Sequence, residues 1–337
     1  MELSNTIILM LDSRRPGGIE SHVYQLAHGL KNFRKKVIVV FIKNYGYHPL
    51  REALIKEGIP TISLKLSVLS LWSLMRNSKS STLHTHGYKA GIMGRIVAYL
   101  TNTPVTSTFH MGELPKGKLI VYDWLDRHTA AIASTVFSVS TLISKRLPIK
   151  SRIIDNFVNT RNLKISTGKQ IAFVGRLSYE KGADYFLEIT KRFPNQRFHI
   201  YGDGPEAEKL QSIASINTIF HGLQSNMSTV WEKIGLLVMP SRNEGLPLAA
   251  LEAMARGIPV LASNVGALDQ LVKEDKNGWL IPSGNMDDFS EKVDFWIHMS
   301  LTKRTTLKIA AQKTIKQRFS SDIVIPKLIK SYKEISY

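Results

Sequence analysis

The stretch GLLVMPSRNEGLPLAALEAMARGIPVLAS, residues 235–263, contains a strand, a loop, a helix and a second strand in succession. Pro247 suits the first turn of a helix, because the N–H group that proline lacks has no partner there, and Gly257 suits the position just after the helix. Two apolar strands joined by one helix are typical of a parallel sheet, since parallel strands need a crossover connection. The stretch therefore predicts one unit of an α/β fold.

The same alternation of apolar, β-branched segments and helical patterns extends through both halves of the chain. In the first half the predicted strands are TIILML (6–11), VIVVFI (37–42), TISL (61–64), STLHTHG (81–87), PVTSTFH (104–110), TVFSVS (135–140) and SRIIDNF (151–157). In the second half they are KQIAFVGRL (169–177), RFHIYGDG (197–204), NTIFHG (217–222), IGLLVMPS (234–241), IPVLAS (258–263) and GWLIPSG (278–284).

A chain of 337 residues is long for a single hydrophobic core. We therefore predict two doubly wound, Rossmann-like α/β domains, at residues 1–160 and 161–318. The polar, turn-prone segment near residues 158–169 is the predicted linker. A last helix, at residues 319–337, is expected to pack back on the first domain.

The composition is that of an ordinary folded protein, with 43% hydrophobic and 9% aromatic residues. The chain contains no cysteine, which excludes disulfides and thiolate metal sites and fits a reducing compartment. The first apolar run, residues 6–11, is too short to span a membrane and lacks the basic flank of a signal peptide. We expect this run to form the first strand.

The net charge of +18 is concentrated in the first half of the chain. Residues 1–165 contain 23 Lys and Arg against 9 Asp and Glu, while residues 166–337 contain 22 against 18. Positive charge concentrated on one domain indicates an anionic partner, which could be a nucleic acid, an acidic membrane surface or an anionic substrate.

Ligands of open parallel sheets bind beyond the carboxyl ends of the strands, so the turns between strands and helices are where chemistry is expected. After the first strand, Gly17 and Gly18 would let the backbone approach a ligand at the start of a helix. After the strand at 169–177, Arg176 and Lys181 come before an amphipathic helix and are suited to bind a diphosphate. Neither turn has the G-x-G-x-x-G pattern of a dinucleotide site.

The turn within residues 235–263 adds two acids. Glu244 lies in the loop with Gly245 and Leu246, and Glu252 lies on the helix that follows. A loop and helix N-terminus of this kind can hold a phosphate, which leaves the two carboxylates to accept hydrogen bonds from hydroxyl groups on either side. Acids are usually solvated surface groups, but Glu252 stands within AALEAMA, where a buried carboxylate without a partner would be costly.

These motifs resemble those of the retaining family 4 glycosyltransferases, which have the GT-B fold. VGRLSYEKG, YGDGPEAEKL and residues 240–285 resemble the C-terminal domain of that family, and GGIESHVYQLAHGL, LHTHGYKAG and TSTFH resemble the N-terminal domain. The resemblance covers nearly the whole chain. It implies two Rossmann-like domains that face each other across a cleft, where a nucleotide-sugar donor binds and reacts with retention of the anomeric configuration.

The resemblance also implies roles for single residues. Glu244 matches the acid that binds the donor hexose and Glu252 the acid that binds the ribose, with Gly245 and Leu246 beside them in the donor site. Arg176 and Lys181 match the pair that binds the diphosphate. Gly17 and Gly18 match the loop that faces the diphosphate and the acceptor. His110 matches the histidine near the transferred sugar, and with Glu244 it is the expected catalytic residue.

The chain departs from the family pattern at two places. It has GALDQ, residues 266–270, where Gly-Gly-x-Pro-Glu is common, and Phe157 where a glycine is common. The first departure concerns detailed contacts to the donor and the second concerns the geometry of the hinge. Neither falls on the expected cations or acids.

The sequence predicts an enzyme that needs neither a metal nor a cofactor. It contains no Asp-x-Asp motif, and His84 and His86 have no third ligand at metal-binding spacing, so we expect Arg176 and Lys181 to neutralise the leaving diphosphate. His84 and His86 are expected to be packing or turn residues. A histidine at a strand end is more often structural than catalytic, and the family resemblance is what favours a catalytic role for His110.

The basic first half suggests where the enzyme works. KNFRKK, residues 31–36, and SVLSLWSLMRNSKS, residues 67–80, combine cations with apolar residues and suit an anionic membrane surface. We expect a bacterial enzyme at the cytoplasmic face of the membrane that extends a lipid-linked or cell-surface glycan in polysaccharide or lipopolysaccharide synthesis. UDP is the expected nucleotide, with guanosine and adenosine diphosphates as alternatives.

Two other functions fit parts of the sequence. A sugar-nucleotide epimerase or a phosphorylase of the same architecture would share the nucleotide site and would turn over without an acceptor glycan. A nucleic-acid-binding protein would explain the charge, but the sequence has no recognition-helix, zinc-finger or RNA-binding signature, so no nucleic-acid partner is expected.

Overall fold

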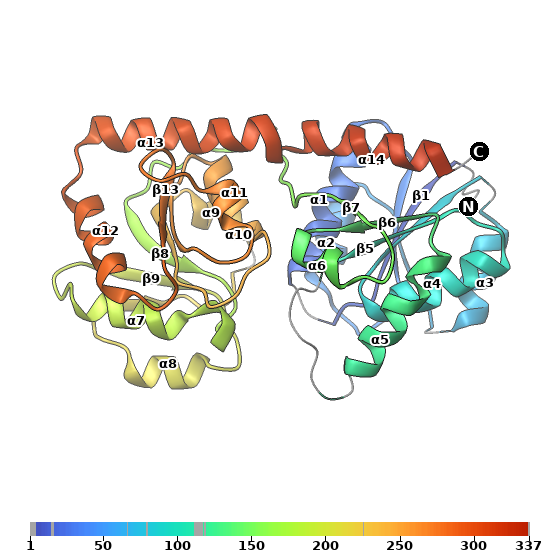
Figure 1. Cartoon of the computed structure of the whole chain (residues 1–337), viewed down its shortest axis with the longest axis horizontal. Coiled ribbons are helices and arrows are strands. Elements are labelled where there is room, and N and C mark those ends of the chain that lie inside the picture. The colour runs from blue at the N-terminus through green and yellow to red at the C-terminus, as the bar shows by residue number, and fades with distance from the viewer. Residues whose placement is uncertain are drawn as a thin grey trace. The chain divides into compact units, whose positions relative to one another are not determined.

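The computed structural model describes residues 5–14, 17–65, 67–78, 80–110, 117, 119–224 and 226–335. The chain divides into two compact units (Figure 1). Unit 1 consists of Met1–Asn159 together with Ser321–Tyr337, and unit 2 is Thr160–Ser320. Each unit is an α/β domain with its own parallel sheet.

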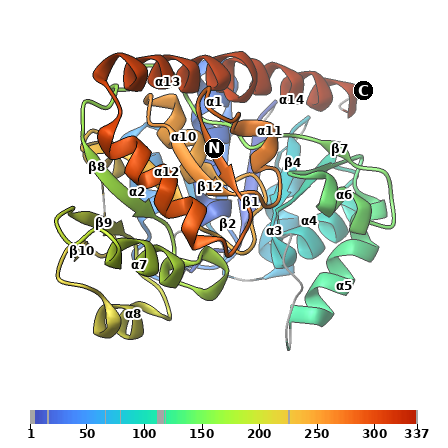
Figure 2. The ribbon, with the colours of Figure 1, turned by 60° about the vertical axis from the view of Figure 1, so that its left-hand side comes forward.

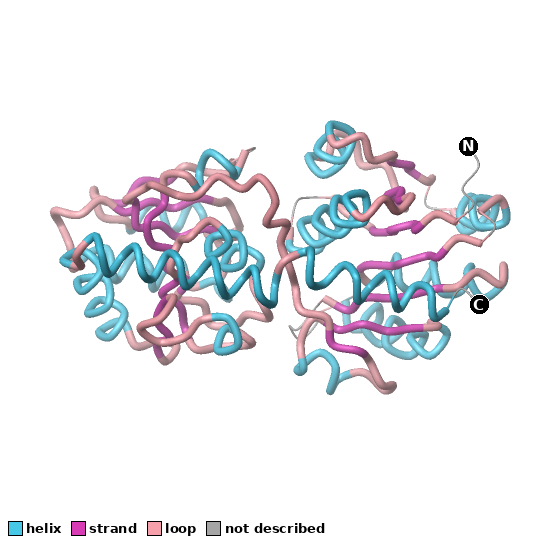
Figure 3. Tube along the Cα trace, turned by 90° about the horizontal axis from the view of Figure 1, so that it is seen from above, coloured by secondary structure: helices cyan, strands magenta, loops and turns pink. Residues whose placement is uncertain are grey.

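Unit 1 contains a seven-stranded sheet in the order β3-β2-β1-β4-β5-β6-β7, in which every neighbouring pair is parallel. The strands are β1 (Ile7–Leu11), β2 (Val37–Phe41), β3 (Thr61–Ser63), β4 (Thr82–His86), β5 (Val105–Phe109), β6 (Thr135–Ser138) and β7 (Arg152–Ile153). Its helices are α1 (Gly18–Asn32), α2 (Pro49–Lys56), α3 (Val68–Arg76), α4 (Tyr88–Leu100), α5 (Leu119–Thr129), η1 (Ala130–Ile132), α6 (Thr141–Arg146) and α14 (Ser321–Ile335). The strands lie side by side in Figure 3.

Helices cover both faces of this sheet, because alternate residues of each strand point to opposite faces. Leu9 of β1 belongs to a core that includes Leu26 of α1 and Leu328 of α14. Ile8 and Met10 of the same strand belong to a separate core with residues of α3 and α4. A strand buried on both faces is apolar throughout, as β1 (Ile7–Leu11) is.

The last helix, α14, belongs to unit 1 although unit 2 precedes it in the chain. It packs on α1, where a Cβ added to Gly29 would lie 2.7 Å from Cδ1 of Ile325. At its far end, the hydroxyl group of Tyr332 is 2.6 Å from Nδ1 of the buried His84. The unit therefore needs α14 to complete one face of its sheet.

Unit 2 contains a six-stranded parallel sheet in the order β10-β9-β8-β11-β12-β13. The strands are β8 (Gln170–Val174), β9 (Phe198–Tyr201), β10 (Thr218–Phe220), β11 (Ile234–Met239), β12 (Val260–Ser263) and β13 (Gly278–Ile281). The helical elements are η2 (Tyr179–Lys181), α7 (Ala183–Lys191), α8 (Ala207–Ile213), α9 (Met227–Trp231), α10 (Leu248–Ala255), α11 (Leu268–Leu271), α12 (Met286–His298), α13 (Leu301–Thr314) and the π-helix η3 (Ile315–Phe319).

Helices α7 and α12 pack beside each other against this second sheet (Figure 2). Phe186 of α7 and Phe289 of α12 are fully buried in the core that they share with the strands. The stretch at 235–263 forms β11, α10 and β12, as predicted. Pro247 is the residue just before α10, and Gly257, with a φ of +75°, follows its end.

The predicted fold class, two doubly wound α/β domains, is confirmed. Within the described ranges, every helix is too short or too polar to cross a membrane.

Candidate functional site

An ion pair joins two of the predicted site residues in unit 2. Lys181 ends η2 after β8, and Glu244 lies in the loop after β11; the two strands are neighbours in the sheet, so both loops lie at the same edge. Nζ of Lys181 is 2.7 Å from Oε2 of Glu244. The hydroxyl group of the buried Ser241 donates to the other carboxylate oxygen at 2.9 Å. Glu244 is thus a buried carboxylate with a partner on each oxygen.

Two glycines allow the loops that carry this ion pair to approach each other closely. Gly182, with a φ of +66°, follows Lys181, and a Cβ there would lie 2.1 Å from the carbonyl oxygen of Pro240. Gly266, with a φ of +64°, approaches the carbonyl oxygen of Glu244 in the same way, also at 2.1 Å. A side chain at either position would push backbone segments apart, so the geometry of the ion pair depends on glycine.

Arg242 braces the same loop, and the sequence analysis did not identify it. Its guanidinium makes two hydrogen bonds to the carboxylate of Asp184, at 2.7 and 2.6 Å. It also lies over the rings of Tyr179 and Tyr185, at 4.2 and 3.8 Å. Hydrogen bonding to Asp184 raises the pKa of Arg242, so this cation stays charged and fixes the start of the loop. In the sequence, the one indication of this role was that Arg242 directly follows the predicted strand at 234–241, where site residues are expected.

The remaining donor-site candidates of unit 2 differ in exposure. Arg176 is exposed just after β8. A Cβ at Gly245 would meet nothing within 4 Å, so the backbone of the loop is open there, whereas Leu246 is buried. Burial tends to raise the pKa of Glu180, but hydrogen bonds and the charges of Lys181 and Arg176 bring it below its ordinary value. Lys181 and Arg176 thus both act on the charge of a neighbouring carboxylate at this edge of the sheet.

Glu252 lies on α10 and has a partner within unit 2. Nε1 of the buried Trp231 donates a hydrogen bond of 3.0 Å to Oε2 of Glu252. Burial raises the pKa of Glu252, and the charge of Arg256, the residue just after α10, acts in the opposite direction. The carboxylate is thus held in place by an indole N–H group.

The predicted residues of unit 1 lie at the carboxyl edge of its sheet. Gly17 precedes α1 with extended backbone, and a Cβ at Gly18, the first helical residue, would meet nothing within 4 Å. His110 follows β5, and its Nε2 lies 3.0 Å from Nδ1 of His86. Burial, together with the neighbouring His22 and His84, lowers the pKa of His110 well below its ordinary value.

His22 of α1 joins this histidine cluster, and the spacing of His84 and His86 gave no sign of it. Its ring centroid lies 4.6 Å from that of His110, and its Nδ1 lies 3.1 Å from Oδ1 of Asn156. His84 is fully buried between the hydroxyl groups of Tyr332 and Thr108.

Beside His110, a hollow in unit 1 is lined by polar side chains of α4, α5 and α6. Its lining includes Tyr88, His110, Asp123, Arg127 and Arg146. Asp123 and Arg127 form an ion pair one turn apart on α5, so the hollow offers groups of both charges. The hollow is small, and the apolar side chains of Phe109, Ile143 and Leu147 complete its lining.

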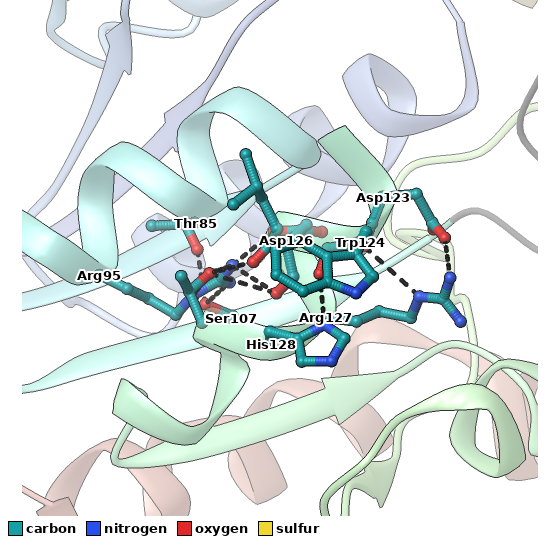
Figure 4. A network of polar contacts seen from close by, with 10 residues as sticks. Thr85, Arg95, Ser107, Asp123, Trp124, Asp126, Arg127 and His128 are labelled. Atoms are coloured by element: carbon teal, nitrogen blue, oxygen red, sulfur yellow. Dashed lines mark hydrogen bonds and ion pairs between the residues drawn. The ribbon is translucent and has the colours of Figure 1, made fainter. Parts of the chain in front are cut away.

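A buried network fixes the position of α5 and therefore of this hollow (Figure 4). The fully buried guanidinium of Arg95 donates to Oδ1 of Asp126 at 2.5 Å, to the hydroxyl group of Thr129 at 2.7 Å and to that of Ser107 at 2.9 Å. Gly91 leaves room for this pair, since a Cβ there would lie 2.3 Å from Oδ1 of Asp126. The sequence analysis did not identify Arg95.

The predicted residues thus fall into two groups. Arg176, Lys181, Glu244, Gly245, Leu246 and Glu252 lie in unit 2, and Gly17, Gly18 and His110 lie in unit 1.

Comparisons with known proteins agree on a family. The sequence model of "Glycosyltransferase Family 4" matches residues 16–161, and that of "Glycosyl transferases group 1" matches residues 156–314. The chain is 30% identical over 272 residues to the UDP-Gal:alpha-D-GlcNAc-diphosphoundecaprenol alpha-1,3-galactosyltransferase of Escherichia coli, which covers 69% of this chain and 70% of that protein. It is 25% identical over 340 residues to an uncharacterized glycosyltransferase of Methanocaldococcus jannaschii, with 95% of each chain covered.

A solved structure extends the likeness to the fold of the whole chain. The crystal structure of HepE from Anabaena in complex with UDP-glucose matches with a TM-score of 0.84, over 98% of this chain and 99% of that one. The two sequences are 18% identical, so this likeness concerns the fold alone.

Proposed function

This chain belongs to the family 4 glycosyltransferases of the GT-B fold, and on that basis we propose that it transfers a hexose from a uridine diphosphate donor to a glycan acceptor. The E. coli relative is named for a UDP-galactose donor and a lipid-diphosphate acceptor, which supports this choice of substrates. We also propose that the anomeric configuration is retained. The pathway would be the synthesis of a bacterial polysaccharide or lipopolysaccharide.

The observation that carries the proposal is the Lys181–Glu244 pair. The Lys181 side chain is 28% exposed and that of Glu244 only 3%, so the ammonium group reaches solvent while the carboxylate anchors it. An ammonium group has three N–H donors, and those not used by Glu244 can bind phosphate oxygens. Each carboxylate oxygen keeps a lone pair beyond its bond to Lys181 or Ser241, and a hexose hydroxyl group would donate to Glu244 at the small part of its side chain that is exposed.

The chemistry follows from where charge develops. Cleavage of the glycosidic bond leaves negative charge on the diphosphate and positive character on the sugar ring. We propose that Arg176 and Lys181 stabilise the leaving group without a metal ion, because fixed cations act most strongly where charge appears in the transition state. Gly245 and Leu246 would present the loop backbone to the donor, and Glu252 would hold the ribose. In unit 1, Gly17 and Gly18 would face the diphosphate, and His110 the transferred sugar.

The experiment that tests this site measures transfer from UDP-hexoses to a lipid-linked glycan in the presence of EDTA. Arg176→Met and Lys181→Met should each lower kcat/KM by about 10²- to 10³-fold, the usual loss when one such donor is removed. Lys191→Met changes an exposed cation at the end of α7 in the same unit and should leave the rate unchanged. Wild-type rates in both site variants, or a requirement for added metal, would contradict the proposal. Turnover of the donor without any acceptor would instead indicate an epimerase or a phosphorylase.

We further propose that unit 1 binds the acceptor at an anionic membrane on the cytoplasmic side. Val68, Leu69 and Trp72 of α3 are exposed apolar side chains, and the guanidinium of Arg76 lies 4.7 Å from the centroid of the Trp72 ring. α5 also carries four exposed apolar side chains, those of Leu119, Ile120, Val121 and Trp124. Exposed apolar groups beside cations suit the boundary of an anionic bilayer, at about 1 kcal/mol per well-placed cation.

Flotation with liposomes tests this membrane proposal. The chain should bind vesicles that contain phosphatidylglycerol at low salt and dissociate as salt is raised, because the attraction is screened. Leu69→Ser combined with Trp72→Ser should weaken binding, and Ile216→Ser, an exposed apolar residue of unit 2, should not. If the wild-type chain does not bind anionic vesicles, the membrane proposal is contradicted and the donor-site proposal is unaffected.

A further inference from the structure

Three imidazole rings meet at the carboxyl edge of the unit 1 sheet. His22 comes from α1, His86 ends β4 and His110 follows β5, and each offers a ring nitrogen within 4.8 Å of the other two. The ring centroids lie 4.6 Å apart for His22 and His110, 5.3 Å for His86 and His110, and 5.5 Å for His22 and His86. Segments 64 and 24 residues apart in sequence are brought together because β4 and β5 are adjacent strands and α1 follows the neighbouring β1.

The hydrogen bonds inside this cluster leave one buried nitrogen unsatisfied. Nδ1 of His86 and Nε2 of His110 share a hydrogen bond of 3.0 Å. Nε2 of His86, a fully buried residue, has no hydrogen-bond partner among the described residues. Buried polar atoms without a partner are rare in folded proteins, so this nitrogen points to a group that binds there.

We propose that His22, His86 and His110 bind one divalent transition-metal ion of the zinc class. Three imidazole nitrogens suit zinc, copper or nickel, whereas magnesium and calcium prefer oxygen ligands. Zinc–nitrogen bonds of about 2.0–2.1 Å place the nitrogens of a tetrahedral site about 3.3 Å apart, so the rings need only small shifts to close around the ion. The fourth position would be taken by water or by a ligand from the hollow that His110 lines.

The surroundings of the cluster support a built site. Metal-binding histidines usually donate their second N–H group to a fixed acceptor, which orients the ring. Oδ1 of Asn156 lies 3.1 Å from Nδ1 of His22 and can serve as this acceptor. The alternative is that the imidazoles only bond to each other, as His199 and His221 do in unit 2, where Nδ1 and Nε2 are 2.9 Å apart.

A bound ion would inhibit the enzyme, and this consequence rests on the proposed function. A metal ion that occupies a ring nitrogen of His110 removes it from the transferred sugar. Magnesium should have no such effect, because the cluster offers it no oxygen ligand. The enzyme should therefore be active in EDTA, indifferent to magnesium and inhibited by zinc.

Calorimetric titration of the metal-free full-length chain with zinc chloride tests the site directly. We expect one site per chain. His22→Phe, which removes one ligand and keeps a similar volume, should weaken zinc binding by at least about tenfold, given that the loss of even an orienting partner costs 10- to 100-fold. His221→Phe is the matched control, since it removes one member of the two-histidine pair in unit 2, and it should leave the affinity unchanged. Melting curves identify any variant that fails to fold.

X-ray absorption of the zinc-loaded chain gives a second readout that does not depend on any variant, and it should show at least three nitrogen ligands at about 2.0–2.1 Å. Failure of the wild-type chain to bind zinc, binding that survives His22→Phe unchanged, or binding lost with His221→Phe would each overturn the inference. If the chain transfers sugar but binds no zinc, only this inference fails. If it binds zinc at this site but transfers no sugar, the proposed function fails and the metal site stands.

Discussion

At the scale of single residues, Lys181 and Glu244 share one ion pair but are unequally shielded from water. The carboxylate is nearly inaccessible, while part of the lysine side chain reaches solvent. A buried charge that loses its partner stays unsolvated, whereas an exposed one is taken up by water. The two members of the pair therefore contribute differently to stability.

Lys181→Met should destabilise the chain by about 2–3 kcal/mol, because it leaves Glu244 buried with Ser241 as its remaining hydrogen-bond partner. Glu244→Gln should cost less than about 1 kcal/mol, since the amide can still accept from Lys181 and donate to Ser241. Urea unfolding of both variants measures the difference. Equal losses would mean that the carboxylate is better hydrated than its burial indicates.

His199 supplies a test of pH dependence in unit 2. Burial and the nearby charges of His221, Arg197 and Lys233 lower the pKa of His199 to about 4, from 6.5. Between pH 6.5 and 4 the unfolded chain binds a proton here that the folded chain does not, so stability falls as the pH falls. Because His199 is partly open to solvent, screening makes this loss smaller than the full shift would give.

His199→Phe should therefore flatten the decline of unfolding free energy between pH 6.5 and 4. His298→Gln changes an exposed histidine on α12 and should leave the decline as it is in the wild-type chain. Urea unfolding of the three proteins at a series of pH values measures the slopes. The same slope in wild-type chain and His199→Phe would show that His199 takes up its proton as readily when folded.

At the scale of elements, the loops of the proposed donor site approach each other backbone to backbone, at positions where only glycine fits. Gly182 and Gly222 both have left-handed backbone, with φ of +66° and +65°. A Cβ at Gly182 would strike the carbonyl oxygen of Pro240, while one at Gly222 would meet nothing within 4 Å. Replacing either glycine by alanine therefore costs free energy because of the left-handed backbone, but only the replacement of Gly182 also produces a steric clash.

Gly222→Ala should thus cost about 1–2 kcal/mol, the usual penalty for left-handed backbone in a residue other than glycine. Gly182→Ala should cost at least about 3 kcal/mol, because η2 and the loop after β11 must also separate. It should weaken binding of UDP as well, since Lys181 moves with η2. Urea unfolding and titration with UDP provide the two measurements. If both variants lose a similar amount of unfolding free energy, the loops can separate at little cost and the prediction is wrong.

The strands and helices were predictable, but the meeting points of distant side chains were not. Periodic apolar segments with proline and glycine at their ends predicted β11, α10 and β12 within a few residues, because these signals are local. The meeting of His22 with His86 and His110 depends on the strand order β1-β4-β5, which no spacing in the sequence encodes. For the same reason the residues that brace the sites, Arg95 and Arg242, were missed.

The GT-B fold predicted from the motifs is confirmed at the scale of the whole molecule. The sequence identified candidates for the site by their turn positions and by the family resemblance, and the structure supplies the local partners of those in unit 2. The assigned roles of Glu244, Glu252 and His110 stay predictions, because they concern contacts to substrates. Sequence patterns indicate which turns carry chemistry, while the bonds made there depend on tertiary packing.

The attachment of α14 to unit 1 leads to a prediction about where stability resides. Tyr332→Phe should leave Nδ1 of the buried His84 without its partner at 2.6 Å and cost about 1–3 kcal/mol. Hydrogen exchange should become faster in β4 and α1 of unit 1 and stay unchanged in β11 of unit 2. Tyr99→Phe, at an exposed position of α4, is the control and should change neither. Faster exchange in both units would show that they do not unfold separately.

The position of α14 in the chain also has a consequence for folding during translation. α14 is translated after all of Thr160–Ser320, so the side of α1 around Gly29 stays uncovered until unit 2 has been synthesised. Unit 1 is therefore synthesised first but completes its fold last. A nascent chain arrested before position 321 would contain an incomplete unit 1 with an exposed apolar surface, to which chaperones could bind.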